Sequence, residues 1–269
     1  VAKGSRLDKT RGQGGMNHLI LLAKDNTGYR NLCRLVSEAY LTGFYYKPRI
    51  DLELLEEHAE GLVGLSACLK GEIPELLLNN QPGEAKQAAL RFQSILGKDN
   101  FFLEMQDHGI REEQVVLPQI LKLSRELNIP AVATNDIHYL HRHDSDVHDV
   151  LLCIQTNKQK HDTARMRYEA EKFYLKTREE MEALFGTTPE LLDNTLRVAE
   201  MCNVELPSSM MLPDFQVPDG ETLDSYLQRI SEEGLEKLKE QGRLRGDIPM
   251  STYRERLQAE LDVLKLKGF

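Results

Sequence analysis

The sequence predicts an α/β domain with parallel strands, followed by a mainly helical C-terminal segment. Short, continuous apolar runs flanked by polar residues predict strands that are buried on both faces, as in parallel sheets. Stretches of helical periodicity lie between these runs, and alternation of strand and helix is typical of a parallel barrel or an open sheet. From about Asp144 onward the strand signals fade and helical patterns take over, which predicts the helical segment.

Four apolar runs are the predicted strands. Each is only four to six residues long and is bounded by turn or polar residues, which favours a strand over a buried helix. In chain order the runs are His18–Ala23, Gly61–Ser66, Phe101–Met105 and Ala131–Thr134.

Three helices are predicted beside these strands. The segment Tyr29–Thr42 places its apolar residues on one stripe, and Gly43 follows as a C-terminal stop. The segment Glu84–Leu96 also ends before a glycine. The segment Glu112–Asn128 is a long amphipathic pattern, and Pro118 is expected to kink or restart it.

The chain divides into three predicted regions. Residues 1–205 form the α/β domain, and residues 206–220, which contain three prolines and almost no helical pattern, form a linker. Residues 221–269 begin a further, helical domain with two charged helices, Thr222–Gly242 and Thr252–Lys267. Because the chain starts without Met and stops just after a helical pattern, we expect it to be a segment of a longer protein.

The composition is that of an ordinary globular protein, with 41% hydrophobic and 29% charged residues. No apolar run approaches the roughly 18 residues that a membrane-spanning helix needs, and no signal peptide opens the chain. The four cysteines lie far apart without a CxxC pair, which suits a reducing cytoplasm better than a disulfide framework. We therefore expect a cytoplasmic protein with no membrane partner.

The charge is unevenly distributed. The net charge of −9 argues against nucleic-acid binding over the whole surface, but residues 1–50 carry nine Lys/Arg against three Asp/Glu. This basic region is either a solvated face or a local site for phosphates, and the sequence leaves both open. Lys47 and Arg49, in the tyrosine-rich stretch 43–49, are the candidate phosphate-binding residues.

Potential metal ligands follow three of the predicted strands. Cys68 lies two residues beyond the second run, His108 three beyond the third, and Asp136 and His138 just beyond the fourth. In a parallel α/β barrel such residues gather at the carboxyl ends of the strands. Thiol, imidazole and carboxylate groups are the ligands of zinc, manganese and iron. In an extended segment, residues i and i+2 point to the same side, so Asp136 and His138 could face one metal.

The other histidines are weaker candidates. His18 begins its run, so we expect it at the opposite end of the sheet. His141, His143 and His148 lie among aspartates in a polar run that leads into a helix, which favours a solvated turn with capping carboxylates. The chain contains no Gly-rich phosphate loop, no GxSxG motif and no acidic pair in the setting of a polymerase active site.

Several segments, in order along nearly the whole chain, resemble the DnaE-type alpha subunits of bacterial DNA polymerase III. They are Gly4–Lys9, His18–Arg30, Gly43–Asp51, Leu65–Pro74, Phe102–Gly109, Ala133–Leu140, Phe173–Thr177 and Tyr253–Phe269. The last of these is similar to the lead-in to that family's polymerase palm.

The resemblance implies an incomplete, distorted parallel barrel of the PHP (polymerase and histidinol phosphatase) type, which in complete form binds up to three metals. It implies that Cys68, His108, Asp136 and His138 are metal ligands for zinc or manganese. It also implies metal-dependent 3′–5′ exonuclease chemistry here, and polymerisation with magnesium in a palm beyond this chain. DNA, a sliding clamp, an exonuclease subunit and a clamp loader are the implied partners.

Part of the family pattern is missing from the chain. The family's HxH motif and its neighbouring ligands precede the matched segments, and the palm aspartates follow them. We therefore expect DNA polymerase activity of the full-length protein and no activity of these 269 residues alone. Two alternatives stay open, namely a standalone PHP phosphoesterase and a noncatalytic PHP domain that braces the polymerase.

Overall fold

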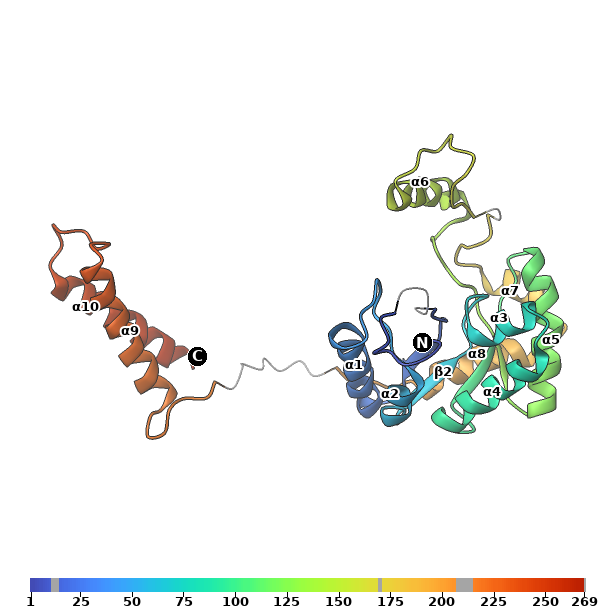
Figure 1. Ribbon diagram of the computed structural model, residues 1–269, viewed down its shortest axis with the longest axis horizontal. Coiled ribbons are helices and arrows are strands. Elements are labelled where there is room, and N and C mark those ends of the chain that lie inside the picture. The colour runs from blue at the N-terminus through green and yellow to red at the C-terminus, as the bar shows by residue number, and fades with distance from the viewer. Residues whose placement is uncertain (11–14, 169–170, 207–214, 269) are drawn as a thin grey trace. The chain divides into compact units, whose positions relative to one another are not determined.

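The computed structural model describes residues 1–10, 15–168, 171–206 and 215–268. The chain forms two compact units, Val1–Leu206 and Pro207–Phe269, and each is described by itself (Figure 1). Most of the predicted linker, residues 207–214, lies outside the described residues. No helix in the described ranges is both long enough and apolar enough to cross a membrane.

The first unit contains four strands and most of the helices. The strands are β1 (Ile20–Ala23), β2 (Leu62–Leu65), β3 (Phe101–Met105) and β4 (Ala131–Ala133). The helices before β4 are α1 (Asn26–Leu41), α2 (Leu52–Glu57), α3 (Glu72–Leu78), α4 (Pro82–Leu96) and α5 (Arg111–Leu127). After β4 come η1 (Arg142–Asp144), α6 (Ser145–Thr156), α7 (Arg178–Phe185) and α8 (Glu190–Met201).

The strands form one mixed open sheet in the order β1-β2-β3-β4. β2, β3 and β4 are parallel, as predicted, but β1 is antiparallel to β2, with Ile20 opposite Leu65. The expectation of a wholly parallel sheet is therefore wrong for β1. The physical reason is visible in its burial, because Ile20 is 41% exposed whereas every residue of β2 is buried. An edge strand of this kind is not constrained to the doubly covered, parallel arrangement.

The sheet separates two hydrophobic clusters because successive side chains of a strand point to opposite faces. The larger cluster joins Leu62, Phe101 and Leu103 to the helices α3, α4 and α5. The smaller cluster lies on the other face of the sheet, where strand residues pack against Val198 of α8. Its buried residues are Val63, Leu65, Phe102, Val132 and Val198. Both faces of β2 and β3 are thus covered, which leaves the strand ends as the place for polar chemistry.

The predicted helices agree with α1, α4 and α5 to within a few residues. α5 runs unbroken through Pro118, where a kink or restart was expected. The proline removes the hydrogen bond to the carbonyl of Gln114, and both residues are exposed, so water can replace it. The short helices α2 and α3 were not predicted, because six or seven residues do not show a full helical repeat.

The second unit contains α9 (Leu223–Glu240) and α10 (Met250–Lys267), as predicted. Thr222 caps α9 by accepting a hydrogen bond from the Ser225 N–H. The two helices are joined by the ion pairs Arg254–Glu236, at 2.6 Å, and Lys265–Asp224, at 3.5 Å. Neither helix buries any residue in this unit.

Candidate metal centre

His18 lies beside Cys68, at the edge where β2, β3 and β4 end. Its ring Nδ1 is 3.6 Å from Cys68 Sγ. Its backbone N–H donates a hydrogen bond to the Lys70 carbonyl oxygen over 2.9 Å. The expectation that His18 lies at the opposite end of the sheet is therefore wrong. Because β1 runs antiparallel to β2, the residue before β1 meets the residues after β2.

Cys68 is held in a tight turn after β2. Ala67 has φ +63°, a left-handed conformation that is costly for a residue with a Cβ, and such strain often marks functional loops. Gly71 donates its N–H to the Cys68 carbonyl over 2.7 Å. A Cβ on Gly71 would lie 2.0 Å from the Ser66 carbonyl oxygen, so the turn needs glycine there. Burial raises the pKa of the Cys68 thiol, and the charges of Asp136 and Glu104 raise it further.

Asp136 and His138 lie in the loop after β4. Asp136 has φ +38°, so the backbone at this residue is not the extended one assumed for the Asp-x-His spacing. His138 Nδ1 is 2.8 Å from the Asp136 carbonyl oxygen, which can only accept, so Nδ1 carries the proton. Nε2 therefore has a lone pair, which accepts a hydrogen bond from the Tyr168 hydroxyl over 3.0 Å. Histidines that bind a metal through one ring nitrogen usually donate the N–H of the other ring nitrogen to a carbonyl or carboxylate oxygen, as Nδ1 does here.

The Asp136 carboxylate acts electrostatically on its neighbours at this edge. Burial lowers the pKa of His18, as does the charge of Lys70, while Asp136 opposes both. Burial raises the pKa of the Tyr168 hydroxyl, and the charges of Asp136 and Cys68 add to this. His18, Cys68, Asp136 and, through Tyr168, His138 therefore belong to one electrostatic cluster.

His108 lies apart from this cluster in its hydrogen bonding. It is 1% exposed and stacks on Phe173, with the ring centroids 4.1 Å apart. Its Nδ1 is 2.6 Å from Glu113 Oε1, and its Nε2 is 2.9 Å from the Asn135 carbonyl oxygen. Because the carbonyl only accepts, Nε2 carries a proton and has no lone pair for a metal. In this conformation His108 ties β3 to the loop that carries Asp136, and its role as a ligand stays a prediction.

Glu104 is a candidate that the sequence interpretation missed. It lies in β3 and is only 6% exposed, yet its Oε2 has no hydrogen-bond partner among the described residues. Burial raises the pKa of this carboxyl group, although hydrogen bonds from Thr134 and Gln106 act to lower it. The sequence signal was a single acidic residue within the apolar run Phe101–Met105.

Lys47 and Arg49 lie at different depths in the turn that follows α1. Arg49 is 3% exposed, and its guanidinium donates to the carbonyl oxygens of Gly43, Arg6 and Asp8 over 2.8–3.1 Å. Lys47 is exposed, and its charge lowers the pKa of His18 after the larger effects of burial, Lys70 and the N-terminus. Lys47 is therefore a solvent-exposed charge that acts on His18, whereas Arg49 holds the turn.

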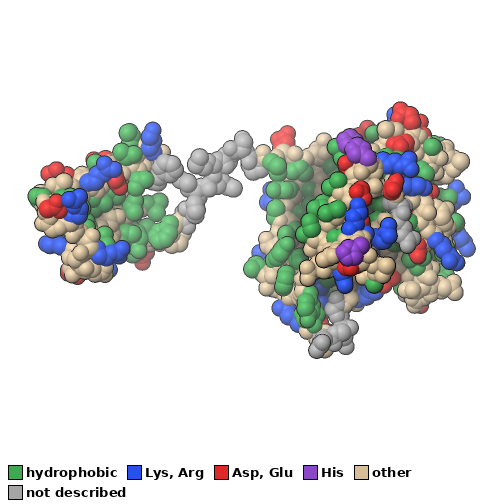
Figure 2. Space-filling model, turned by 90° about the horizontal axis from the view of Figure 1, so that it is seen from above, with side chains coloured by type: hydrophobic (Ala, Val, Ile, Leu, Met, Phe, Trp, Pro, Cys, Tyr) green, Lys and Arg blue, Asp and Glu red, His purple; other side chains and the backbone are tan. Residues whose placement is uncertain are grey.

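The donors gathered at this edge suit a divalent metal in their chemistry, since imidazole, thiolate and carboxylate together bind zinc or manganese. Within the described residues, however, no three His, Cys, Asp or Glu side chains already form a complete metal-binding group. Figure 2 shows one face of the molecule, on which histidines lie near Lys, Arg, Asp and Glu side chains and exposed hydrophobic side chains form a band beside them. The unpartnered Glu104 oxygen is the observation that best fits a missing cation.

Comparison with known proteins identifies the region. Residues 3–108 match the PHP domain family. The DNA polymerase III subunit alpha of Treponema pallidum is 45% identical over 239 residues, which cover 87% of this chain and 20% of that protein. The Borreliella burgdorferi subunit is 42% identical over 275 residues, covering 100% and 23%, and that of Thermus aquaticus is 44% identical over 245 residues, covering 87% and 20%.

The chain spans about a fifth to a quarter of the length of these relatives. The matches run through both of its units, and the PHP family match covers β1, β2 and β3 with the residues around Cys68. The chain is therefore a segment of the bacterial DNA polymerase III alpha subunit family that includes the PHP-domain region.

Proposed function

We propose that this chain is the PHP portion of a bacterial replicative DNA polymerase and that it carries metal-dependent 3′–5′ exonuclease or phosphoesterase chemistry in the full-length protein. The observation that carries the proposal is the 3.6 Å approach of His18 Nδ1 to Cys68 Sγ at the edge where the parallel strands end, with Asp136 and His138 in the loop after β4. When bound, a divalent metal supplies Lewis acidity toward water and toward phosphoryl oxygens.

The protein side chains have separate roles in this proposal. His18, Cys68, Asp136 and His138 hold the metal, and His108 fixes the loop between β4 and His138 through the Asn135 carbonyl. Further ligands come from residues that precede this segment in the full-length protein. The sheet of four strands then belongs to an incomplete, distorted barrel that those residues complete.

Lys47 is the proposed phosphate contact, with Arg49 beneath it as the residue that shapes the turn. We expect Lys47→Ala to weaken DNA binding and to lower its salt dependence by about one phosphate contact without unfolding the turn. Arg49→Ala should instead destabilise the turn, because three carbonyl oxygens lose their donor. Fluorescence anisotropy with a single-stranded oligonucleotide at several salt concentrations separates the two effects.

The wider assignments belong to the full-length protein. They are DNA-directed DNA synthesis with magnesium in a palm domain, association with a sliding clamp, an exonuclease subunit and a clamp loader, and a cytoplasmic location. The division into a PHP domain (1–205), a linker (206–220) and a helical start of the palm region (221–269) is part of the same proposal.

The test compares two activities in the full-length protein. The variant Asp136→Asn with His138→Ala should lose exonuclease activity and retain polymerase activity. The matched control, Asp146→Asn with His143→Ala, changes the same residue types at exposed positions outside the site and should retain both activities.

Other outcomes favour the alternatives. A noncatalytic bracing role predicts that the site variant loses thermal stability and polymerase activity together. A standalone phosphoesterase predicts hydrolysis of small phosphate esters by a protein that makes no DNA. Unchanged exonuclease activity in the site variant would contradict the proposed function.

A further inference from the structure

Glu104 is a buried carboxylate with one oxygen engaged and the other free. Its Oε1 accepts hydrogen bonds from Gln106 Nε2 over 3.0 Å and from Thr134 Oγ1 over 2.5 Å. The Ala67 N–H favours the charged form, but no donor among the described residues forms a hydrogen bond with Oε2. Leaving a buried acceptor unsatisfied costs about 1–3 kcal/mol, and more for a charged group, so its retention has to be explained.

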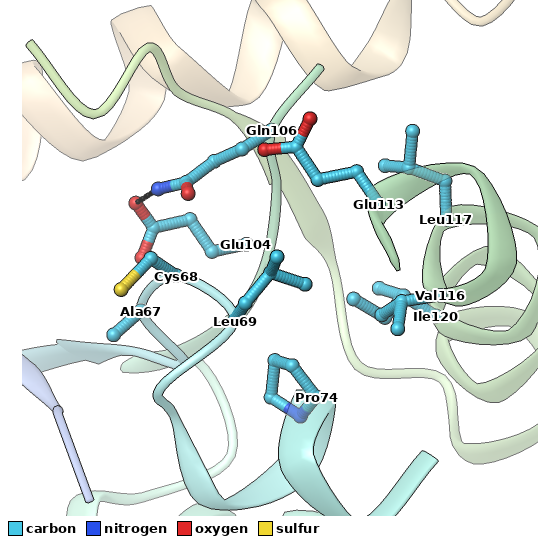
Figure 3. A pocket seen from close by; sticks show the side chains of 10 residues that line it. All are labelled: Ala67, Cys68, Leu69, Pro74, Glu104, Gln106, Glu113, Val116, Leu117 and Ile120. Atoms are coloured by element: carbon cyan, nitrogen blue, oxygen red, sulfur yellow. Dashed lines mark hydrogen bonds between the residues drawn. The ribbon is translucent and has the colours of Figure 1, made fainter. Parts of the chain in front are cut away.

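Glu104 and Cys68 both line a small cavity whose other walls include Pro74 of α3 and Val116 and Ile120 of α5. This cavity has a volume of about 20 Å³ and lies where β2 and β3 end (Figure 3). A space of this size holds about one water-sized particle. In Figure 3 the dashed hydrogen bond from Gln106 reaches one carboxylate oxygen of Glu104. The Cys68 thiol lies on the side of the other carboxylate oxygen.

The position of Glu104 in the sheet makes its retention costly. Its side chain is on the same sheet face as Phe102, two residues before it, and it pairs in register with Val132. That face otherwise carries the smaller hydrophobic cluster. The hydrogen bonds from Gln106 and Thr134 to Oε1 fix the orientation of the carboxylate, so Oε2 stays buried and unpartnered.

The Cys68 thiol provides a second donor on the side of the unpartnered oxygen (Figure 3). Thiolate and carboxylate groups both bind divalent metals such as zinc.

We propose that Glu104 is an additional ligand of the candidate metal centre, contributing its free oxygen beside Cys68. Gln106 and Thr134 act as positioning residues that hold the carboxylate in its binding orientation. The ligand is a divalent cation that accepts sulfur and oxygen donors together, of which zinc and manganese are the test ions. This inference rests on the proposed function only in requiring that the centre binds such a metal.

The substitution Glu104→Gln separates metal binding from a structural role. The amide oxygen of glutamine can keep both hydrogen bonds, whereas its NH₂ group replaces Oε2 and cannot bind a metal. With metal removed by a chelator, the full-length variant should melt at the same temperature as the wild type or higher, because a free acceptor and a negative charge are gone. With zinc or manganese added, its metal affinity should fall by at least about tenfold. The metal-induced rise in Tm should shrink accordingly.

The matched control is Glu126→Gln, the same change at an exposed carboxylate of α5 that pairs with Lys86. Its metal affinity and metal-induced rise in Tm should equal those of the wild type. Isothermal titration calorimetry of the full-length proteins, with differential scanning fluorimetry in chelator and in metal, gives both quantities.

The outcomes distinguish this inference from the proposed function. Wild-type metal binding with unchanged affinity in Glu104→Gln overturns the role of Glu104 and leaves the metal centre standing. A variant that is less stable than the wild type in chelator, but binds metal equally well, shows a structural carboxylate and also overturns it. Absence of metal binding by the wild-type protein overturns both.

Discussion

Asp51 joins the N-terminal segment to the start of α2. It accepts hydrogen bonds from the Arg6 and Leu54 N–H groups and forms an ion pair with the Arg6 guanidinium over 2.8 Å. Burial opposes ionisation, but these three interactions outweigh it and lower the pKa of Asp51 below its ordinary value of 3.8. The carboxylate therefore stabilises the fold above that value, and this contribution is lost as the pH falls through the lower pKa of the folded state.

We predict that Asp51→Asn lowers the free energy of unfolding by about 1–3 kcal/mol at pH 7, because charge-assisted hydrogen bonds are lost. The difference from the wild type should shrink as the pH falls below about 4. Urea unfolding at pH 7, 5 and 3 measures it. A difference that stays constant over this range would show that the charge of Asp51 contributes nothing.

His108 is a second position where one residue fixes several others. The substitution His108→Phe keeps a ring against Phe173 but leaves Glu113 Oε1 and the Asn135 carbonyl without their hydrogen-bond partner. We predict a loss of at least about 1–3 kcal/mol, the usual cost of leaving buried acceptors without a donor. The double variant with Glu113→Leu should recover part of that loss, because the stranded carboxylate is removed.

Denaturant unfolding of the two variants tests this pairing of His108 with Glu113. A loss below about 0.5 kcal/mol in His108→Phe, or no recovery in the double variant, would contradict it. Retention of metal affinity in His108→Phe would support a positioning role over coordination.

The candidate site was only partly accessible from the sequence. Cys68, His108, Asp136 and His138 were predicted as ligands because each follows a buried apolar run and residues after parallel strands meet at one edge, and their role as ligands stays a prediction. His18 was misplaced because the direction of an edge strand cannot be read from an apolar run. Glu104 was missed because an acidic residue inside a strand gives no sign of whether its oxygens find partners.

At the scale of elements, α1 and the loop before β2 approach each other closely. An added Cβ on Gly28 would lie 1.9 Å from the Gly61 carbonyl oxygen, which already accepts from the Lys24 N–H over 2.8 Å. We predict that Gly28→Ala destabilises the first unit by about 1–3 kcal/mol, since the helix must move away from backbone that cannot yield.

Gly83→Ala is the control, because it adds the same methyl group near the start of α4, where nothing lies within 4 Å. It should be neutral or stabilising by up to roughly 1 kcal/mol. The midpoints of thermal unfolding of the two variants test this prediction. Equal midpoints would show that the space between Gly28 and the Gly61 carbonyl can accommodate a methyl group.

Element boundaries were more predictable than element directions. β3 matches its predicted run completely, and β2 and β4 differ from theirs only at the ends, because continuous burial of a strand is recorded in its composition. The direction of β1 depends on pairing with a segment far away in the chain, and no local pattern encodes it. The continuity of α5 through Pro118 likewise depends on the solvent exposure of the lost hydrogen bond.

At the scale of the whole molecule, the two units differ in what holds them together. The first has a sheet with hydrophobic clusters on both faces, whereas α9 and α10 in the second bury no residue within that unit. Helices gain most of their stability from packing an apolar face, so this pair is weakly stabilised by itself.

We predict that amide hydrogens of α9 and α10 exchange much faster than those of β2 and β3 when the 269-residue chain is studied alone. Hydrogen–deuterium exchange with mass spectrometry compares the two units in one sample. Equal protection would show that the second unit has stabilising contacts beyond the ion pairs Arg254–Glu236 and Lys265–Asp224.

The central claim is that the edge formed by His18, Cys68, Asp136 and His138 binds a divalent metal. X-ray absorption at the zinc edge of the zinc-loaded, full-length protein tests it most directly, because it identifies the donor atoms. We predict a sulfur donor at about 2.3 Å and nitrogen or oxygen donors at about 2.0–2.2 Å, with the sulfur signal lost in Cys68→Ser. A stoichiometric zinc without a sulfur donor, or a protein that retains no zinc, would contradict it.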